Sequence, residues 1–325
     1  MTPKVINYTG LPEDLQARLA SRTDLSIVDS LDLSSAELRS LLPEAQGLIG
    51  VNETVGTELL DLAPQLKVAS TISVGYNHFD VAELSRRGIM LMHTPDVLND
   101  TTADMIFTLI LCAARRVTEM IELVRQGKWV KDIGAEHFGS DVYRKKLGII
   151  GMGRIGQAVA KRAHNGFDMD ICYYNRSAKQ EAEKAFNARR LPLDELLAEA
   201  DFVCVVLPLT AETTKLIGAR ELGLMKKSAF LINGGRGPVV DEAALIEALQ
   251  SQSIRGAGLD VYEQEPLPLD SPLRHLANVV TLPHIGSATS ETRYAMAECA
   301  VNNLIDALER KSTRNCVNPK VADNT

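Results

Sequence analysis

Residues 146–160 read KLGIIGMGRIGQAVA, and this stretch decides the fold class. The apolar run LGII predicts a buried strand and QAVA begins a helical run, with Gly151, Gly153 and Gly156 between them. In a strand–turn–helix unit of this kind the first glycine allows a tight turn, the second lets the backbone approach a pyrophosphate, and the third lets the helix pack on the strand. The helix N-terminus also offers N–H groups to phosphate oxygens. The stretch therefore predicts a dinucleotide-binding turn, and a tight turn without a ligand is the alternative.

The same alternation of short apolar strands and amphipathic helices extends along most of the chain. It is typical of a parallel sheet covered by helices on both faces, with ligands at the carboxyl ends of the strands. We therefore predict an α/β protein with two doubly wound parallel-sheet domains (Rossmann-like or flavodoxin-like) and an active-site cleft between them. Besides the strand before the glycine turn, the predicted strands are 4–9, 25–30, 47–51, 67–71, 89–93, 170–175, 201–208, 228–234, 255–261 and 278–283.

Two helical segments mark the borders of the predicted domains. Residues 100–127 start with the capping-type Asp100 and stop at Gly127, which predicts one long buried helix. The pattern of residues 289–309 predicts the last helix of the chain. The domains that we expect are an NAD(P)-binding Rossmann domain of residues 100–286 and a discontinuous substrate domain of residues 1–99 plus 287–325.

Composition excludes several classes of function. The formal net charge is −7 at pH 7, which argues against a nucleic-acid partner because the phosphate backbone needs a basic surface. No apolar run approaches the roughly 20 residues that a membrane helix needs, and the first ten residues lack the apolar core of a secretory signal. The five cysteines and six histidines form no CxxC, HxH or HxxxH pair, so no metal is predicted. We expect a cytoplasmic protein with a small-molecule substrate and no membrane partner.

The residues after the strand at 170–175 bear on the choice of cofactor. A site that prefers NAD places Asp or Glu about 20 residues after the glycine turn, where it holds the ribose 2′-hydroxyl. This chain has Asn175, Arg176 and Ser177 there. Arg176 can bind a 2′-phosphate through a charge-assisted fork, and Arg154 can add a second positive charge. We expect NADP(H) to be preferred and NAD(H) to be possible; a solvated surface role for Arg176 is the alternative.

Three polar residues stand at successive strand exits of the second half of the chain. Arg236 follows FLINGG, Glu265 lies in LDVYEQEP and His284 lies in TLPHIGSAT. Arginine recognises a carboxylate through two parallel bonds, histidine can give up a proton near neutral pH, and a neighbouring glutamate favours the charged imidazolium. Each residue alone has an ordinary structural explanation, but together they are suited to the reduction of a 2-oxo acid beside a nicotinamide.

Five strings make the chain resemble the D-isomer-specific 2-hydroxyacid dehydrogenase family over essentially its whole length. The resemblance implies that Arg236, Glu265 and His284 are the catalytic set and that the amides of Val74 and Gly75 bind the substrate carboxylate. It also implies a homodimer formed through the cofactor domain, with Trp129 near the partner's active site. The strings are STISVGYNHFD (70–80), GMGRIG (151–156), INGGRGPVVDEAAL (232–245), GLDVYEQEPL (258–267) and LPHIGSATSETR (282–293).

The function that the resemblance implies is NADPH-dependent reduction of small 2-oxo acids to D-2-hydroxy acids. Glyoxylate, hydroxypyruvate and 2-keto-D-gluconate are the expected substrates. A dehydrogenase of another 2-hydroxy acid remains an alternative, although a formate dehydrogenase would carry Gln in place of Glu265. A phosphoglycerate dehydrogenase is less expected because no regulatory domain follows. From a different class, a dinucleotide-sensing corepressor on this fold is a further alternative.

Other candidate contacts sit at strand exits or helix starts. Thr102 is a candidate for facing the nicotinamide, with a helix cap as the alternative, and Asp260 for bonding the cofactor carboxamide, with a turn-stabilising role as the alternative. Arg293 is expected to form an ion pair on the last helix, with the substrate entry as the alternative. Tyr76–His78 are candidates for holding substrate hydroxyl groups. The remaining predicted cofactor contacts are Ile155, Leu207, Pro208, Asn233, Gly235, His284 and Gly286, and the predicted substrate contacts are Val74, Gly75, Arg236, His284 and Ser287.

Overall fold

A computed structural model of the chain describes residues 2–324 and divides it into two compact units. The central unit is Asn99–Ser287, and the N-terminal unit consists of the residues up to Leu98 together with those from Ala288 onwards. Asn99 and Ser287, which we expected in the substrate domain, belong to the central unit. The borders therefore lie one residue away from the expected ones.

The N-terminal unit is built on a five-stranded parallel sheet. Its strand order, β2-β1-β3-β4-β5, is that of flavodoxin-like folds, and the direction of winding reverses between β1 and β3. Strands of such a sheet are apolar on both faces because helices cover both. The strands are β1 (Lys4–Asn7), β2 (Asp24–Ile27), β3 (Gly47–Gly50), β4 (Val68–Thr71) and β5 (Met90–Met92).

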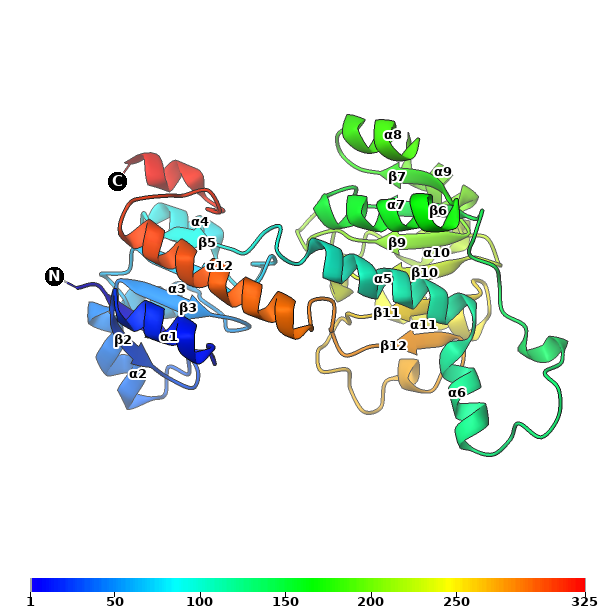
Figure 1. Ribbon diagram of the computed structural model, residues 1–325, viewed down its shortest axis with the longest axis horizontal. Coiled ribbons are helices and arrows are strands. Elements are labelled where there is room, and N and C mark those ends of the chain that lie inside the picture. Colours follow the sequence, from blue (N-terminus) through cyan, green and yellow to red (C-terminus); the bar gives the residue numbers. More distant parts are fainter. Residues whose placement is uncertain (1, 325) are drawn as a thin grey trace. The chain divides into compact units, whose positions relative to one another are not determined.

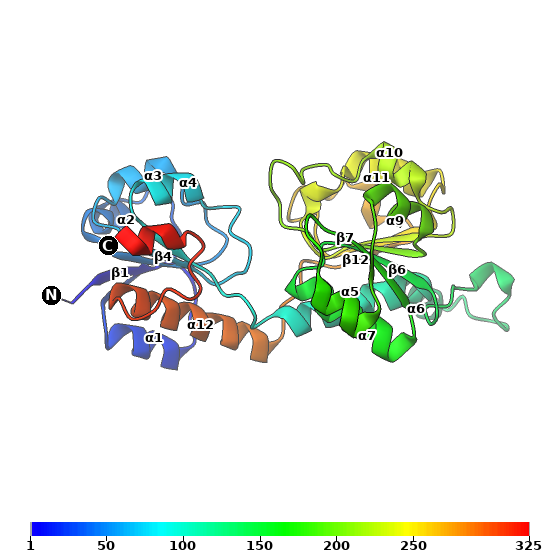
Figure 2. The same cartoon turned by 90° about the horizontal axis from the view of Figure 1, so that it is seen from above.

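Helices cover both faces of this sheet. Figure 2 shows α1 and α12 on one face and α2, α3 and α4 on the other. Leu38, Leu60 and Leu84 from α2, α3 and α4 are fully buried against the strands. The helices are α1 (Glu13–Ala20), α2 (Ala36–Leu41), α3 (Thr57–Leu62), α4 (Val81–Arg86) and α12 (Ser290–Leu308), with short 3₁₀ turns η1 (Leu42–Glu44) and η5 (Pro319–Asn324).

The central unit is built on a seven-stranded parallel sheet in the order β12-β11-β10-β9-β6-β7-β8. This is the Rossmann order with one added strand, and the winding reverses between β6 and β9. Ligands of doubly wound sheets bind outside the carboxyl ends of the strands at such a reversal. The strands are β6 (Lys146–Ile150), β7 (Asp170–Tyr174), β8 (Arg189–Arg190), β9 (Phe202–Val205), β10 (Phe230–Asn233), β11 (Gly256–Leu259) and β12 (Val279–Thr281).

Two apolar cores lie on the two faces of the central sheet. Figures 1 and 2 show α5 and α7 on one face and α9, α10 and α11 on the other. The predicted α/β fold class with two doubly wound parallel sheets is confirmed. The helices are α5 (Asn99–Ala114), α6 (Val117–Arg125), α7 (Arg154–Phe167), α8 (Gln180–Phe186), α9 (Leu193–Glu199), α10 (Ala219–Leu224) and α11 (Glu242–Gln250), with 3₁₀ turns η2 (Ala135–His137), η3 (Gly237–Val239) and η4 (Pro272–Arg274).

The prediction of one long helix over residues 100–127 was wrong. The segment forms two helices, because Arg116 adopts a left-handed conformation with φ of 53° and so ends the first of them. The Arg116 guanidinium binds the Glu119 carboxylate and the carbonyl of Glu136, which fixes the break. Within residues 2–324 there is no helix whose length and apolar character would allow it to cross a membrane.

Candidate active site

The three predicted catalytic residues follow three neighbouring strands of the central sheet. Arg236 comes after β10, Glu265 after β11 and His284 after β12. β11 pairs in parallel with both β10 and β12, so all three strands end at the same edge of the sheet. The topology therefore brings together side chains that are 48 positions apart along the chain.

His284 and Glu265 form a hydrogen-bonded pair. Nδ1 of His284 lies 2.6 Å from Oε2 of Glu265, while Oε1 of Glu265 accepts the N–H of Tyr262 at 3.0 Å. Burial acts to raise the pKa of Glu265, but the bonds from His284 and Tyr262 outweigh it and hold this pKa below its ordinary value. Because Nδ1 is bound to a carboxylate, Nε2 is the ring atom that can exchange a proton with a ligand.

Asp260 holds the backbone that carries His284. Its Oδ1 accepts the N–H of Ile285 at 2.8 Å and its Oδ2 accepts the N–H of Gly286 at 2.9 Å. Burial raises the pKa of Asp260, against the effect of these two bonds. His284 has a φ of 53°, a costly conformation for a residue with a Cβ, and the Asp260 bonds fix the residues immediately after it. This loop contact corresponds to the turn-stabilising alternative, and a contact with the cofactor carboxamide stays a prediction.

Two residues that the sequence did not point to, Tyr262 and Gly237, support the cluster. The buried Tyr262 hydroxyl donates to the carbonyl of Leu282 at 2.9 Å, which ties the exit of β11 to that of β12. A Cβ on Gly237 would lie 1.8 Å from the carbonyl oxygen of Tyr262, so the loops after β10 and β11 pack backbone to backbone. Only a glycine permits this approach. The string GRGPVV shows a glycine directly after the arginine, but it does not show that the loop after β11 lies against this glycine.

Arg236 reaches the same cluster from the loop after β10. Its Nη1 donates to the carbonyl of Gly235 at 2.8 Å. Burial lowers the pKa of Arg236, whereas the negative charge of Glu265 acts to raise it. Asn233 shapes this turn, since its side chain accepts the N–H of Gly235 at 3.1 Å and donates to the carbonyl of Arg236 at 3.2 Å. The guanidinium thus lies within electrostatic reach of the carboxylate that binds His284.

The glycine turn after β6 has the geometry that a pyrophosphate needs. Gly151 has a φ of 107°, and a Cβ there would lie 2.7 Å from the carbonyl oxygen of Val206. A Cβ on Gly156 would lie 2.2 Å from the carbonyl oxygen of Gly151, so the helix packs directly on the turn. At Gly153, by contrast, a Cβ would meet no atom of residues 2–324 within 4 Å. Backbone atoms therefore pack against the first and third glycines of the turn, and the space beside the second glycine is free. This arrangement fits a bound dinucleotide.

The residues that follow β9 pack against the glycine turn from the other side of the strand reversal. Leu207 follows β9 and contacts the turn, since a Cβ on Gly151 would meet it at 3.0 Å. A Cβ on Gly235 would lie 2.9 Å from the carbonyl oxygen of Leu207. The start of α7 carries no acidic residue, and its second residue, Ile155, is half-buried. The exposed Pro208 lies directly after Leu207.

The loop after β7 is polar and carries no carboxylate. The Asn175 side chain donates to the carbonyl of Ser177 at 3.0 Å, and Arg176 is exposed. In the loop after β9, a hydrogen bond from Thr210 lowers the pKa of Glu212, and the positive charge of Arg176 adds to this effect. The sequence did not point to Arg190, which binds this loop from β8, because a two-residue strand gives no periodic signal.

Other predicted contacts are distributed over both units. Thr102 is buried near the start of α5, where its Cγ2 would lie 3.4 Å from a Cβ on Gly286. Ser287 is the last residue of the central unit, and Arg293 is exposed in the first turn of α12. Trp129 is 61% exposed in the segment after α6.

The predicted carboxylate-binding loop follows β4 in the N-terminal unit. The Ser73 hydroxyl donates to the carbonyl of Gly75, and Nδ1 of His93 lies 3.1 Å from the carbonyl oxygen of Val74. The rings of Tyr76 and His93 meet edge to face at 5.7 Å. His93, the residue directly after β5, thus holds the loop. Its role in binding substrate stays a prediction.

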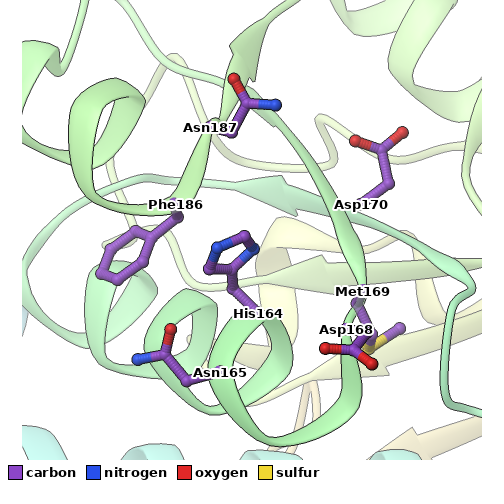
Figure 3. A pocket seen from close by; sticks show the side chains of 7 residues that line it. All are labelled: His164, Asn165, Asp168, Met169, Asp170, Phe186 and Asn187. Atoms are coloured by element: carbon purple, nitrogen blue, oxygen red, sulfur yellow. The ribbon is translucent and has the colours of Figure 1, made fainter.

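The surface hollow shown in Figure 3 lies at the opposite edge of the central sheet. It has a volume of about 410 Å³ and includes Asp170, the first residue of β7. The rings of His164 and Phe186 lie side by side in its lining and meet edge to face with centroids 6.2 Å apart. Because it lies at the amino ends of the strands, it is separate from the predicted site. Its lining is His164, Asn165, Asp168, Met169, Asp170, Phe186 and Asn187.

Comparison with known proteins assigns the chain to a class. Residues 107–286, more than half of the chain, match the family described as "D-isomer specific 2-hydroxyacid dehydrogenase, NAD binding domain". The chain belongs to the D-isomer specific 2-hydroxyacid dehydrogenase family and is an oxidoreductase with an NAD-binding domain. The predicted family and enzyme class are confirmed, and the enzyme is favoured over the corepressor alternative.

Individual relatives are similar over nearly the whole chain. A protein of Citrobacter koseri named glyoxylate/hydroxypyruvate reductase B is 57% identical over 323 residues, which cover 99% of this chain and 100% of that protein. The structure of the NADPH-dependent glyoxylate/hydroxypyruvate reductase of Sinorhizobium meliloti, in complex with NADP and malonate, is similar with a TM-score of 0.87 and 31% identity, covering 98% and 97% of the two chains. A glyoxylate reductase from Paecilomyes thermophila has a TM-score of 0.90 and 30% identity, with coverage of 98% and 99%.

Proposed function

We propose that the protein reduces small 2-oxo acids, glyoxylate and hydroxypyruvate foremost and 2-keto-D-gluconate as a third candidate, to the D-2-hydroxy acids with NADPH. The observation that carries the proposal is the 2.6 Å pair of His284 and Glu265 within electrostatic reach of Arg236, at the strand exits of an NAD-binding domain. The names of the Citrobacter and Sinorhizobium relatives supply the substrate class.

The side chains divide the chemistry among them. Arg236 binds the substrate carboxylate and its carbonyl oxygen, which places the carbonyl carbon for attack. His284, oriented by Glu265, donates the Nε2 proton to the carbonyl oxygen as negative charge develops there. Glu265 fixes the orientation of the ring through Nδ1 and stabilises its positive charge. After turnover His284 is neutral and regains its proton from solvent.

The cofactor fits the residues around the glycine turn. The open side of Gly153 and the N-terminus of α7 would hold the pyrophosphate, and Leu207 and Pro208 would form the wall beside the adenine. When bound, NADPH supplies the hydride that the carbonyl carbon accepts. Thr102 and Asp260 would lie on the nicotinamide side.

Steady-state kinetics test this function directly. The full-length protein is assayed with glyoxylate, hydroxypyruvate and 2-keto-D-gluconate, each with NADPH and with NADH. We expect turnover with at least the first two acids and a higher kcat/KM with NADPH. Failure to oxidise NADPH with any of the three acids would overturn the proposed substrate class.

We propose that NADP(H) is preferred over NAD(H) because Arg176 replaces the carboxylate that an NAD site uses at this place. Replacement of Arg176 by alanine should lower kcat/KM for NADPH by about tenfold, the loss of a charge-assisted bond, and leave that for NADH nearly unchanged. A kcat/KM for NADH that equals or exceeds the NADPH value in the wild-type protein contradicts the preference.

We propose that the protein forms a homodimer through α6 and the segment that follows it. Figure 1 shows this part projecting from the sheet of the central unit, and it exposes several large apolar side chains. A group of exposed apolar side chains in one segment is typical of a protein–protein contact surface. Val124→Asp should shift the sedimentation coefficient from dimer to monomer, whereas Leu269→Asp, at an 83% exposed apolar position elsewhere, should not. The exposed apolar side chains are Ile121, Val124, Trp129, Val130, Ile133, Phe138 and Tyr143.

We propose a cytoplasmic location. All five cysteines are free in residues 2–324, which suits a reducing compartment. Fractionation of cells that express the protein would test this, since recovery in the periplasmic fraction contradicts it.

A further inference from the structure

Arg190 binds two successive carbonyl groups of the loop after β7. It is the second residue of β8 and pairs with Tyr173 of β7. Its Nε donates to the carbonyl of Asn175 at 3.1 Å, and its Nη2 donates to the carbonyl of Arg176 at 2.7 Å. A guanidinium can do this because its donors lie in one rigid planar fork.

This arrangement determines which way the loop's N–H groups point. In a planar trans peptide the C=O and N–H groups point in opposite directions. The carbonyl of Asn175 shares its peptide with the N–H of Arg176, and the carbonyl of Arg176 shares its peptide with the N–H of Ser177. Since both carbonyls point toward one guanidinium, both N–H groups point away from it. Successive N–H groups on one side of the backbone form a concavity that binds anions.

Further bonds fix the same loop at its start and its end. The Tyr173 hydroxyl accepts the N–H of Lys179 at 2.8 Å and donates to Glu183 at 2.6 Å. The Asn175 side chain bonds within the loop, as described above. These bonds within the protein hold the loop, so an anion that binds there does not have to order it.

We propose that Arg190 is a positioning residue for recognition of the 2′-phosphate of NADP(H). It turns the N–H groups of Arg176 and Ser177 toward the phosphate and fixes the backbone that carries the Arg176 side chain. It acts through these carbonyls, without contact to the phosphate. This inference rests on the proposed preference for NADP(H).

Arg189 provides a matched control on the same strand. Neighbouring residues of a strand point to opposite sides, and the Arg189 side chain binds the Glu199 carboxylate at 3.1 Å instead of the loop. Arg189→Ala removes the same charge as Arg190→Ala from an adjacent position. The two variants therefore separate loss of charge from loss of the carbonyl contacts.

The test measures nucleotide binding by calorimetry, without turnover. Adenosine 2′,5′-bisphosphate and AMP serve as probes, because they differ only in the 2′-phosphate. We expect Arg190→Ala to weaken binding of the bisphosphate by about tenfold and binding of AMP by less than about twofold. Arg190→Lys should behave like Arg190→Ala, since an ammonium group cannot bridge both carbonyls in a fixed plane. Arg189→Ala should bind both probes as the wild type does.

A double variant shows whether Arg190 acts through Arg176. In the Arg176→Ala background, we expect Arg190→Ala to weaken bisphosphate binding by less than about threefold, because much of the arrangement it supports is gone. A further tenfold loss would mean that Arg190 does not act by fixing the Arg176 side chain, which overturns that part of the positioning role and leaves only the orientation of the two N–H groups.

Other outcomes also overturn the inference and are distinguishable from one another. Full wild-type binding in Arg190→Lys would show that charge alone matters, and equal weakening of both probes in Arg190→Ala would show a general structural role. If the wild type binds the two probes equally, the NADP(H) preference itself fails and this inference fails with it. If the wild type discriminates and Arg190→Ala discriminates equally well, only the role of Arg190 fails.

Discussion

Each of the two sheets starts with a strand that leads into a helix, β1 into α1 and β6 into α7. The two connections differ in the space that they leave for a ligand. In the central unit, β6 leads into α7 through a turn whose second glycine, Gly153, has free space beside it. In the N-terminal unit, β1 leads into α1 past Tyr8, whose buried ring lies where a Cβ on Gly50 at the end of β3 would clash at 2.3 Å. Tyr8 thus fills the strand reversal between β1 and β3, the place where the central unit offers a site.

The first turns of α1 and α7 also differ in charge, and this difference too favours phosphate binding at α7. The first turn of α1 carries Glu13 and Asp14 behind Pro12, which has no N–H to offer. The first turn of α7 carries Arg154 and no acidic residue. Because a helix N-terminus binds phosphate only where neighbouring charges do not repel it, the winding alone does not make a cofactor site. Side chains at the reversal decide which of two similar sheets binds the dinucleotide.

The substitution with the largest expected effect tests whether the central unit supplies the proton donor of the reaction. Replacement of His284 by alanine should lower kcat by roughly 10²–10⁴ because the carbonyl oxygen loses its proton donor. NADPH binding, measured by fluorescence titration, should persist. His275→Ala, at an exposed histidine of the same unit, serves as the control. Unchanged turnover in the His284 variant would refute the role of proton donor.

The second prediction compares a glycine in each connection. Gly156→Ala places a Cβ 2.2 Å from a backbone oxygen, so the turn must shift, and an overpacked contact costs about 1–3 kcal/mol. The Kd for NADPH should rise by about 10- to 100-fold. Gly10→Ala, where a Cβ would meet no atom of the described residues within 4 Å, should change neither this Kd nor the Tm. Equal effects of the two variants would remove the distinction between the connections.

The third prediction concerns the pH dependence of reduction. Glu265→Gln removes the carboxylate that binds Nδ1 of His284, so reduction should fail at lower pH than in the wild-type protein. In the wild-type protein the lowered pKa of Glu265 keeps the carboxylate ionised below the ordinary Glu range. Its contribution to stability is therefore present at neutral pH and is lost as the pH falls through the lowered value. Coincident pH profiles for the two proteins would contradict the paired action of Glu265 and His284.

The sequence could predict those site residues whose role follows from the residue type and its place after a strand. It could not predict those whose role depends on which loops pack together. The glycine turn and the Arg236, Glu265 and His284 set could be predicted, because strand exits of a doubly wound sheet converge whatever the details of packing. Tyr262 and Gly237 could not, because their roles depend on which two loops touch.

The differences in the fold have a similar origin. The break after α5 depends on the conformation of Arg116, a residue type that normally continues a helix. The two-residue β8 gives no alternation to detect, and so Arg190 was missed with it. By contrast, the strands at 47–51 and 147–150 were predicted to within one residue of β3 and β6, since runs that are buried on both faces are apolar throughout.

The smallest expected effect comes from a substitution that makes the first turn of α7 acidic, as the first turn of α1 already is. Arg154→Glu adds an acidic residue to the first turn of α7, where it opposes a phosphate through both its own charge and the helix dipole. Binding of NADH should weaken by about two- to fivefold through the pyrophosphate, and binding of NADPH by at least as much because Arg154 can also face the 2′-phosphate, while kcat at saturating cofactor stays unchanged. Arg154→Gln should have an intermediate effect, and Glu13→Gln in α1 should have none. If Arg154→Glu binds both cofactors as the wild type does, then charge at the helix start does not separate the two connections, and the open space beside Gly153 must account for the difference by itself.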